Sequence, residues 1–200
     1  MTDLTSDADG HAPDSSPVAL VLVDVINDFD FDDAEQLLRH ARPASERIAA
    51  LKRTARAAGV PVIYANDNFG RWRDDFAAVV ERCLRPGTPG CDIVERLRPE
   101  DDDYFILKPK HSAFFATTME TLLGYLGVHT LVLAGFAGDI CVLATAIDAY
   151  MRDLHVVIPS DAVASVEPEE TDAALAYARR VLDAETPETD AVDFAVLREA

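Results

Sequence analysis

The sequence predicts an α/β fold: a three-layer, Rossmann-like doubly wound sheet of five to six mainly parallel strands with helices on both faces. Short apolar runs alternate with amphipathic helical segments along most of the 200 residues, which is the pattern of βαβ units. The first run, residues 18–25 (VALVLVDV), is apolar at nearly every position. Such a run is typical of a central parallel strand that is covered on both faces.

The predicted domain organisation is simple. Residues 1–17 consist mostly of Asp, Ser, Gly and Pro, so we expect a disordered acidic tail. Residues 18–185 are predicted to form a single domain, and residues 186–200 a C-terminal tail. The range of five to six strands allows for one short strand near Glu185, which the pattern does not resolve.

The first half of the domain is predicted to contribute three strands and two helices. After the strand at 18–25 and an acidic loop, a helix is expected over 44–58, because Ile48, Leu51 and Ala55 share one face. Gly59 is placed to end this helix. The remaining expected elements are a strand at 61–66, a loop at 67–75, a helix at 76–84, a turn-rich break at 85–90 and a strand at 104–108.

The second half repeats the alternation. A helix is expected over 117–126, with Thr117 and Glu120 spaced as a capping box and Gly127 at its end. It is followed by a strand at 130–134, a helix from Ile140, a strand at 154–159 and a helix at 168–182 with acidic residues in its first turn and Arg179 and Arg180 in its last.

Charge and composition limit the partners. Eighteen basic and thirty-six acidic residues give a formal net charge of −18, which argues against nucleic acid or an anionic membrane as a partner. No apolar run is long enough to span a bilayer, and the N-terminus lacks the features of a signal peptide. A cytoplasmic location is therefore expected. The three cysteines lack metal-ligand spacing, and no glycine-rich phosphate loop occurs, so we expect neither a metal nor another cofactor.

Polar residues stand at or just beyond the carboxyl ends of three apolar strands. They are Asp24, Lys108 and Cys141. The carboxyl ends of parallel strands share one edge of a sheet, so these side chains can converge. Cys141 falls in the first turn of its predicted helix, where the helix N-terminus favours a thiolate over a thiol. A carboxylate that takes the thiol proton and an ammonium that steadies the anion complete a nucleophilic set.

Three motifs resemble those of the isochorismatase-like cysteine hydrolase superfamily. They are DVINDF at 24–29, KPKHSAF at 108–114 and GFAGDICV at 135–142, and the resemblance runs from about Val18 to about Leu182. It implies a catalytic triad of Asp24, Lys108 and Cys141. It also implies a cis peptide between Phe136 and Ala137, and an oxyanion hole formed by the Ala137 and Cys141 N–H groups. A dimer or tetramer is expected, because members commonly form homo-oligomers.

The sequence departs from the superfamily pattern at several positions. Ile26 stands where Gln is common, His111 where Tyr is common, and Gly138 where Thr is common. Nicotinamidases of the superfamily carry an Asp-x-His metal motif where this chain reads Asn-Asp-Asn at 66–68. We therefore predict no catalytic metal and do not favour a nicotinamidase.

Four further residues are predicted to line a substrate pocket: Phe29, Trp72, His111 and Phe136. Phe29 and Trp72 could instead cover the core, and His111 could make a structural hydrogen bond. Asn66 and Asp67 either bind substrate or form an Asx turn.

The predicted function is hydrolysis of a C–N bond in a small molecule (an amide, ureide or carbamoyl compound) through a Cys141 thioester. Two alternatives stay open at this point. One is a vinyl-ether hydrolase of the isochorismatase type that uses Asp24 as the acid. The other is a non-catalytic ligand-binding member of the fold.

Overall fold

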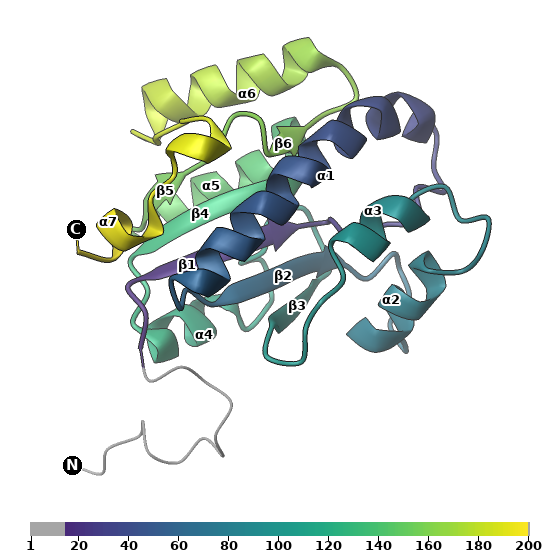
Figure 1. The fold of residues 1–200 in the computed structure, drawn as a ribbon, viewed down its shortest axis with the longest axis horizontal. Helices are drawn as coiled ribbons and strands as arrows, with labels where there is room; N and C mark the ends of the chain where they lie inside the picture. Colours follow the sequence, from purple (N-terminus) through teal and green to yellow (C-terminus); the bar gives the residue numbers. More distant parts are fainter. Residues whose placement is uncertain (1–14, 200) are drawn as a thin grey trace.

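A parallel sheet forms the centre of the protein (Figure 1). The computed structural model describes residues 15–199, so the predicted disorder of residues 1–14 lies outside the described part. Within that part the sheet has six strands in the order β3-β2-β1-β4-β5, with β6 pairing with β4, and all pairings are parallel. The strands are β1 (Val18–Val23), β2 (Val62–Asp67), β3 (Tyr104–Lys108), β4 (Thr130–Phe136), β5 (His155–Val157) and β6 (Val163–Ala164). The predicted α/β class is confirmed.

Helices cover both faces of the sheet, as predicted. They are α1 (Ala34–Ala57), α2 (Phe76–Cys83), α3 (Cys91–Arg96), α4 (Met119–Leu126), α5 (Leu143–Tyr150), α6 (Pro168–Val181) and α7 (Phe194–Glu199). All six residues of β1 are buried. Leu20 and Leu22 pack in the core with α1, α2, α3 and α7, whereas Val21 and Val23 pack on the other side with α4, α5 and α6. This alternation explains why the first strand is apolar throughout.

The first helix is longer than predicted, because α1 begins at Ala34 rather than at Ala44 and runs through Pro43. A proline inside a helix removes one hydrogen bond and usually ends the helix. Here the buried face continues on both sides of Pro43, from Leu37 and Leu38 to Ile48. Packing of this face on the sheet therefore outweighs the local cost of the proline.

Two other local predictions differ from the structure. Helix α4 starts at Met119 without the predicted capping box, because the Thr117 hydroxyl donates to the Ala113 carbonyl and accepts from the Met119 N–H. A capping box is found instead at the start of α6, between Glu167 and Glu170. The sixth strand is β6, not a strand near Glu185, which makes only an isolated bridge to Val157.

The C-terminal segment lies against the domain. A 3₁₀ turn, Thr189–Ala191, is held by Asp161, whose carboxylate accepts from the Thr189 N–H and hydroxyl. In α7, Phe194 is buried and Arg198 donates to the Ala58 and Gly59 carbonyls at the end of α1. Within residues 15–199, no helix has both the length and the apolar character needed to cross a membrane.

Gly135 in β4 is the position where the sheet demands glycine most strictly. Its φ angle is +129°, and a Cβ atom there would lie 2.0 Å from the Val23 carbonyl oxygen of β1. We expect Gly135→Ala to lower the free energy of unfolding by at least about 3 kcal/mol, because backbone strain and overlap with a buried strand combine.

Gly124 in α4 is the matched control, since a Cβ added there meets no atom within 4 Å. Gly124→Ala should raise the free energy of unfolding by up to about 1 kcal/mol through helix propensity. Urea unfolding of the two variants measures the difference, and equal stabilities would contradict the strand pairing described here.

Candidate active site

The three strand-end residues meet at the carboxyl edge of the sheet. Asp24 directly follows β1, Lys108 is the last residue of β3, and Cys141 lies just beyond β4. Because β2 separates β3 from β1, the long Lys108 side chain has to reach across it. Its Nζ lies 2.7 Å from Asp24 Oδ2 and 3.6 Å from Cys141 Sγ. The structure thus brings all three predicted side chains into contact.

Asp24 is held by its own backbone and by the end of β2. Its φ angle is +52°, a left-handed conformation that few non-glycine residues adopt away from turns and functional sites. Its N–H donates to the Ala65 carbonyl, and its Oδ1 accepts from the Asp67 N–H at 2.7 Å. The carboxylate therefore faces Lys108 through one oxygen and the β2 backbone through the other. The role of the Asp67 N–H was missed from sequence, because it depends on strand register.

Burial governs the electrostatics of this cluster. Lys108 is fully buried and the Asp24 side chain is 8% exposed. Burial raises the pKa of Asp24 even though the Lys108 ammonium opposes the shift. Burial lowers the pKa of Lys108, but the Asp24 carboxylate and Cys141 outweigh it, so that the net shift is upward. Lysine therefore stays charged beside a carboxylate that is more basic than an ordinary aspartate.

The predicted preference for a thiolate at Cys141 is wrong for the free protein. Burial raises the pKa of the Cys141 thiol to about 12, with the Asp24 carboxylate adding to the rise and Lys108 opposing it. A helix N-terminus lowers the pKa of a thiol, but here burial and the neighbouring carboxylate raise it by more. Cys141 accordingly rests as a thiol, and Asp24 stands ready to accept its proton.

The turn that carries Cys141 is a π-helix, Gly138–Val142, rather than an α-helix beginning at Ile140. The Ala137 carbonyl accepts from the Ile140 and Val142 N–H groups, and the peptide bond between Phe136 and Ala137 is cis. Ile140 in this turn and Tyr150 at the end of α5 are 46% and 47% exposed, so neither belongs to the buried face of the segment.

Thr145 is a supporting residue that the sequence reasoning missed. Its hydroxyl donates to the Cys141 carbonyl at 2.8 Å and accepts from the Ala113 N–H at 3.1 Å. It thereby joins the Cys141 turn to the loop that follows Lys108. A threonine one turn after the cysteine was the available signal, because threonine hydroxyls in helices commonly bond to the carbonyl four residues earlier.

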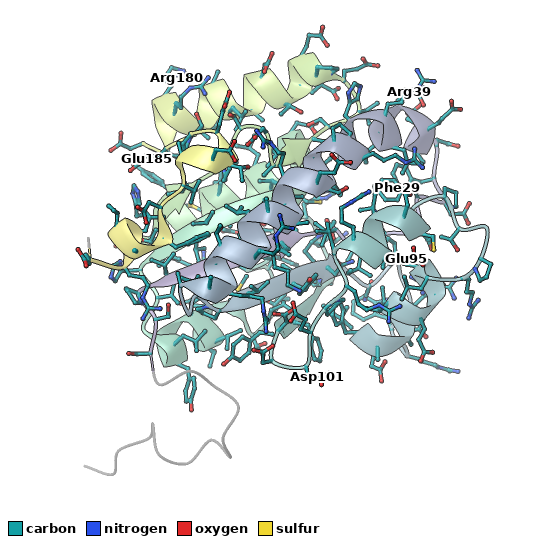
Figure 2. The ribbon with its side chains drawn as sticks, viewed as in Figure 1. Phe29, Arg39, Glu95, Asp101, Arg180 and Glu185 are labelled. Carbon is teal, nitrogen blue, oxygen red and sulfur yellow. The ribbon has the colours of Figure 1, made fainter. Side chains whose placement is uncertain are left out.

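The predicted pocket residues lie in different surroundings. His111 is exposed, and its Nδ1 lies 3.6 Å from Cys141 Sγ. Phe29 and Phe136 are buried with ring centroids 6.3 Å apart, and Phe29 lies beside α3 (Figure 2). Trp72 is 77% exposed, and it takes no part in the hydrogen bonds and ion pair given above for Asp24, Lys108 and Cys141. Thus, of the four, His111 is the residue with a polar contact to the cysteine.

Asn66 and Asp67 have local bonding partners. The Asn66 side chain pairs with the Ile26 backbone, accepting from its N–H at 3.1 Å and donating to its carbonyl at 2.6 Å. Asp67 Oδ1 accepts from the Phe69 N–H, which is the Asx turn expected as one alternative. Asn66 therefore fixes the loop after β1. Among residues 15–199, no group of three or more His, Cys, Asp or Glu side chains is arranged to hold a metal ion.

The sequence as a whole matches a known family. The model of the Isochorismatase domain matches residues 18–186, a stretch that contains Asp24, Lys108 and Cys141. The chain belongs to the isochorismatase-like cysteine hydrolase superfamily. It is therefore an enzyme, a hydrolase of the isochorismatase-like class. The resemblance inferred from the three motifs is confirmed.

Relatives of this isochorismatase-like hydrolase include proteins described as amidases. It is 42% identical over 167 residues to the uncharacterized isochorismatase family protein YaaI of Bacillus subtilis, covering 84% of this chain and 91% of that protein. It is 30% identical over 146 residues to the ureidoacrylate amidohydrolase RutB of Methylorubrum extorquens, covering 63% of this chain and 59% of RutB. The crystal structure of N-carbamoylsarcosine amidase from Thermoplasma acidophilum superimposes with a TM-score of 0.65 at 28% identity, covering 88% and 98% of the two chains.

Proposed function

We propose that this isochorismatase-like hydrolase cleaves a C–N bond of a small amide, ureide or carbamoyl compound through a thioester on Cys141. The observation that carries the proposal is the contact of the buried Asp24–Lys108 pair with Cys141 at one edge of the sheet. The similarity to RutB, a ureidoacrylate amidohydrolase, and to the N-carbamoylsarcosine amidase of Thermoplasma acidophilum supports the same bond class.

In the acylation step, Asp24 takes the Sγ proton while Sγ attacks the carbonyl carbon of the substrate. The burial-raised pKa of Asp24 makes its carboxylate a better base than an ordinary aspartate. Lys108 remains charged 2.7 Å from Asp24, so the buried cluster keeps a positive charge next to the negative charge that moves from Asp24 to sulfur. That placement lowers the cost of forming a thiolate in a buried site.

The tetrahedral oxyanion would lie on the Ala137 and Cys141 N–H groups. Protonated Asp24 then gives its proton to the leaving nitrogen. In deacylation it takes a proton from water, whose oxygen attacks the thioester, and the thiol is restored when Asp24 returns the proton to sulfur.

A screen of ammonia release tests this proposal. Small primary amides, ureides and carbamoyl compounds are offered to the wild-type enzyme and to Cys141→Ala under identical conditions. The wild type should release ammonia from at least one of the three classes, while the variant stays at the level of the buffer blank. Release at the same rate by both proteins, or from none of the classes, would contradict the proposal.

A second candidate function has one observation in its favour. The raised pKa of Asp24 keeps its carboxyl protonated to a higher pH than usual, which suits an acid that protonates a vinyl ether. That reaction needs no thiol, so it predicts that Cys141→Ala keeps most activity and Asp24→Asn loses it.

We further propose that the enzyme acts as a homo-oligomer, a dimer or tetramer, in the cytoplasm, without a cofactor, metal, nucleic-acid or membrane partner. The net charge of −18 supports the exclusion of anionic partners. Tyr150 and Met151 at the end of α5 are 47% and 64% exposed, and adjacent exposed apolar side chains suit contact with another subunit. The division into a domain at 18–185 with tails at 1–17 and 186–200 stays a prediction.

A further inference from the structure

His111 occupies a distinct place around the nucleophile. Lys108 Nζ and His111 Nδ1 each lie 3.6 Å from Cys141 Sγ, and the Asp24 carboxyl is hydrogen-bonded to the thiol. Asp24 and Lys108 are buried, whereas His111 is exposed. Of these three neighbours of the sulfur atom, His111 is the one that also reaches solvent.

The loop that carries His111 is fixed on both sides of that residue. On one side, Lys108 Nζ donates to the Lys110 carbonyl at 3.3 Å. On the other, the Ala113 N–H donates to the Thr145 hydroxyl, which in turn bonds to the Cys141 carbonyl. The imidazole is therefore positioned by the same residues that position the sulfur, and its contact with Sγ does not depend on a free loop.

Cys141 is partly buried, and two of the groups around its sulfur atom, Asp24 and Lys108, are buried. Asp24 Oδ1 is engaged by the Asp67 N–H, Asp24 Oδ2 by Lys108, and Lys108 itself by Asp24 and the Lys110 carbonyl. In the free enzyme, with no leaving group or attacking water at Asp24, a proton exchanged between Cys141 and Asp24 therefore stays between these two groups. An imidazole is suited to pass protons onward, because one ring nitrogen can accept while the other releases.

We propose that His111 is a further catalytic residue, which relays protons between Cys141 Sγ and solvent. In the free enzyme, where no substrate engages Asp24, the S–H proton moves to an unprotonated Nδ1 and leaves a thiolate beside an imidazolium. The imidazolium then loses the proton on Nε2 to water. In the reverse direction, water protonates Nε2 and the Nδ1 proton returns to sulfur, so the imidazole is unchanged over a cycle and no oxidant or reductant is needed.

This inference shares one premise with the proposed function, namely that Cys141 is the nucleophile. It adds a residue in which the chain differs from the superfamily, because a tyrosine at position 111 would offer a hydroxyl in place of a basic nitrogen. Titratable and charged groups on the elements that meet at the pair are Asp24 after β1, Lys108 in β3, Lys110 in the loop, Asp139 in the π-helix and Arg152, which lies over the ring of Phe114.

Alkylation of Cys141 by iodoacetamide tests the relay without any substrate. The rate constant at Cys141 is measured by peptide mass spectrometry from pH 5.5 to 9, with Cys91 in the same chain as an internal reference. In the wild type, the rate should rise with pH, because only an unprotonated imidazole can accept the S–H proton.

His111→Asn is the informative variant, because an amide can hydrogen-bond near the Nδ1 position but cannot relay a proton. We expect it to slow alkylation of Cys141 at pH 7.5 by about tenfold, less than is usual for loss of a general base because Asp24 remains, and to change the pH dependence of the rate. His129→Asn is the matched control. It removes a histidine that lies at the start of β4, the opposite end of the strand from Cys141, and should leave the rate and its pH dependence unchanged.

Two results would overturn the relay. One is an unchanged rate in His111→Asn, and the other is a slower rate with the wild-type pH dependence, which would show that His111 only positions the thiol. These outcomes are independent of the proposed function. If His111→Asn behaves as expected while no amide, ureide or carbamoyl compound is hydrolysed, the relay stands and the assignment of the scissile bond fails.

Discussion

Cys141→Ala should lower kcat/KM for the amide substrate by at least about 10⁴-fold. Removing a covalent nucleophile from a site of this kind leaves only binding and the oxyanion donors to act on the substrate. The Asp24–Lys108 ion pair, at 2.7 Å, does not involve the sulfur atom, so the variant should retain the fold. Steady-state kinetics, with circular dichroism to confirm folding, measure the effect.

Cys91→Ala is the matched control for this substitution. Cys91 is half-buried and its Sγ contacts the Leu84 carbonyl, away from the catalytic cluster, so its replacement should leave kcat/KM within about twofold of the wild-type value, as expected of a residue outside the site. A Cys141→Ala enzyme that keeps most activity while Asp24→Asn loses it would instead favour acid-catalysed cleavage without a thioester.

Lys108→Met should lower the free energy of unfolding by about 3–5 kcal/mol at pH 7.5. Lys108 is fully buried, and methionine fills a similar volume but leaves the buried Asp24 carboxylate without its cation. Urea unfolding monitored by fluorescence gives the value. Activity should be lost as well, because the thiolate formed from Cys141 would lack its positive neighbour.

The loss of stability in Lys108→Met should depend on pH in a defined direction. Burial already raises the pKa of Asp24 above its ordinary value in the wild type, and removal of the ammonium raises it further. A carboxyl whose pKa is higher in the folded than in the unfolded protein, where it is about 3.9, binds more protons when folded. The variant is therefore most stable relative to the wild type in acid, and falls behind as the pH rises through the folded-state pKa of Asp24.

Asp24→Asn/Lys108→Met is the compensating variant. It replaces both charges by neutral groups, so most of the lost stability should return at pH 7.5 and the pH dependence should disappear. A loss in Lys108→Met that is the same at pH 5 and pH 8, or that the double variant does not reverse, would show that packing rather than charge determines the effect.

The fold and the main residues of the site could be predicted because they follow from local pattern and parallel topology. The apolar run in β1 indicates burial on both faces, and the carboxyl ends of β1, β3 and β4 must share one edge of the sheet. Asp24, Lys108 and Cys141 therefore had to lie near one another once the strands were identified. The family motifs added the expectation that these three residues form a catalytic triad.

Features that depend on tertiary packing were missed. The helix expected over 44–58 begins at Ala34 instead, because the buried face of α1 continues through Pro43. The helix N-terminus suggested a thiolate at Cys141, whereas burial and the Asp24 charge raise the pKa of that thiol. Two contacts, the Thr145 bridge and that of His111 with Sγ, depend on how the loop after β3 packs against the Cys141 turn. No spacing in the sequence specifies this packing.

The intact mass of the enzyme during turnover tests for the thioester on Cys141, which is the intermediate that defines the proposed mechanism. A substrate found in the ammonia screen is mixed with the wild-type protein, the reaction is quenched with acid within milliseconds to seconds, and the intact mass is recorded. Covalent catalysis predicts a population heavier by the mass of the acyl group, located on the peptide that contains Cys141, and released by hydroxylamine as a thioester would be. An adduct of the same mass in Cys141→Ala, or sustained turnover by the wild type with no adduct at Cys141 under any quench time, would contradict it.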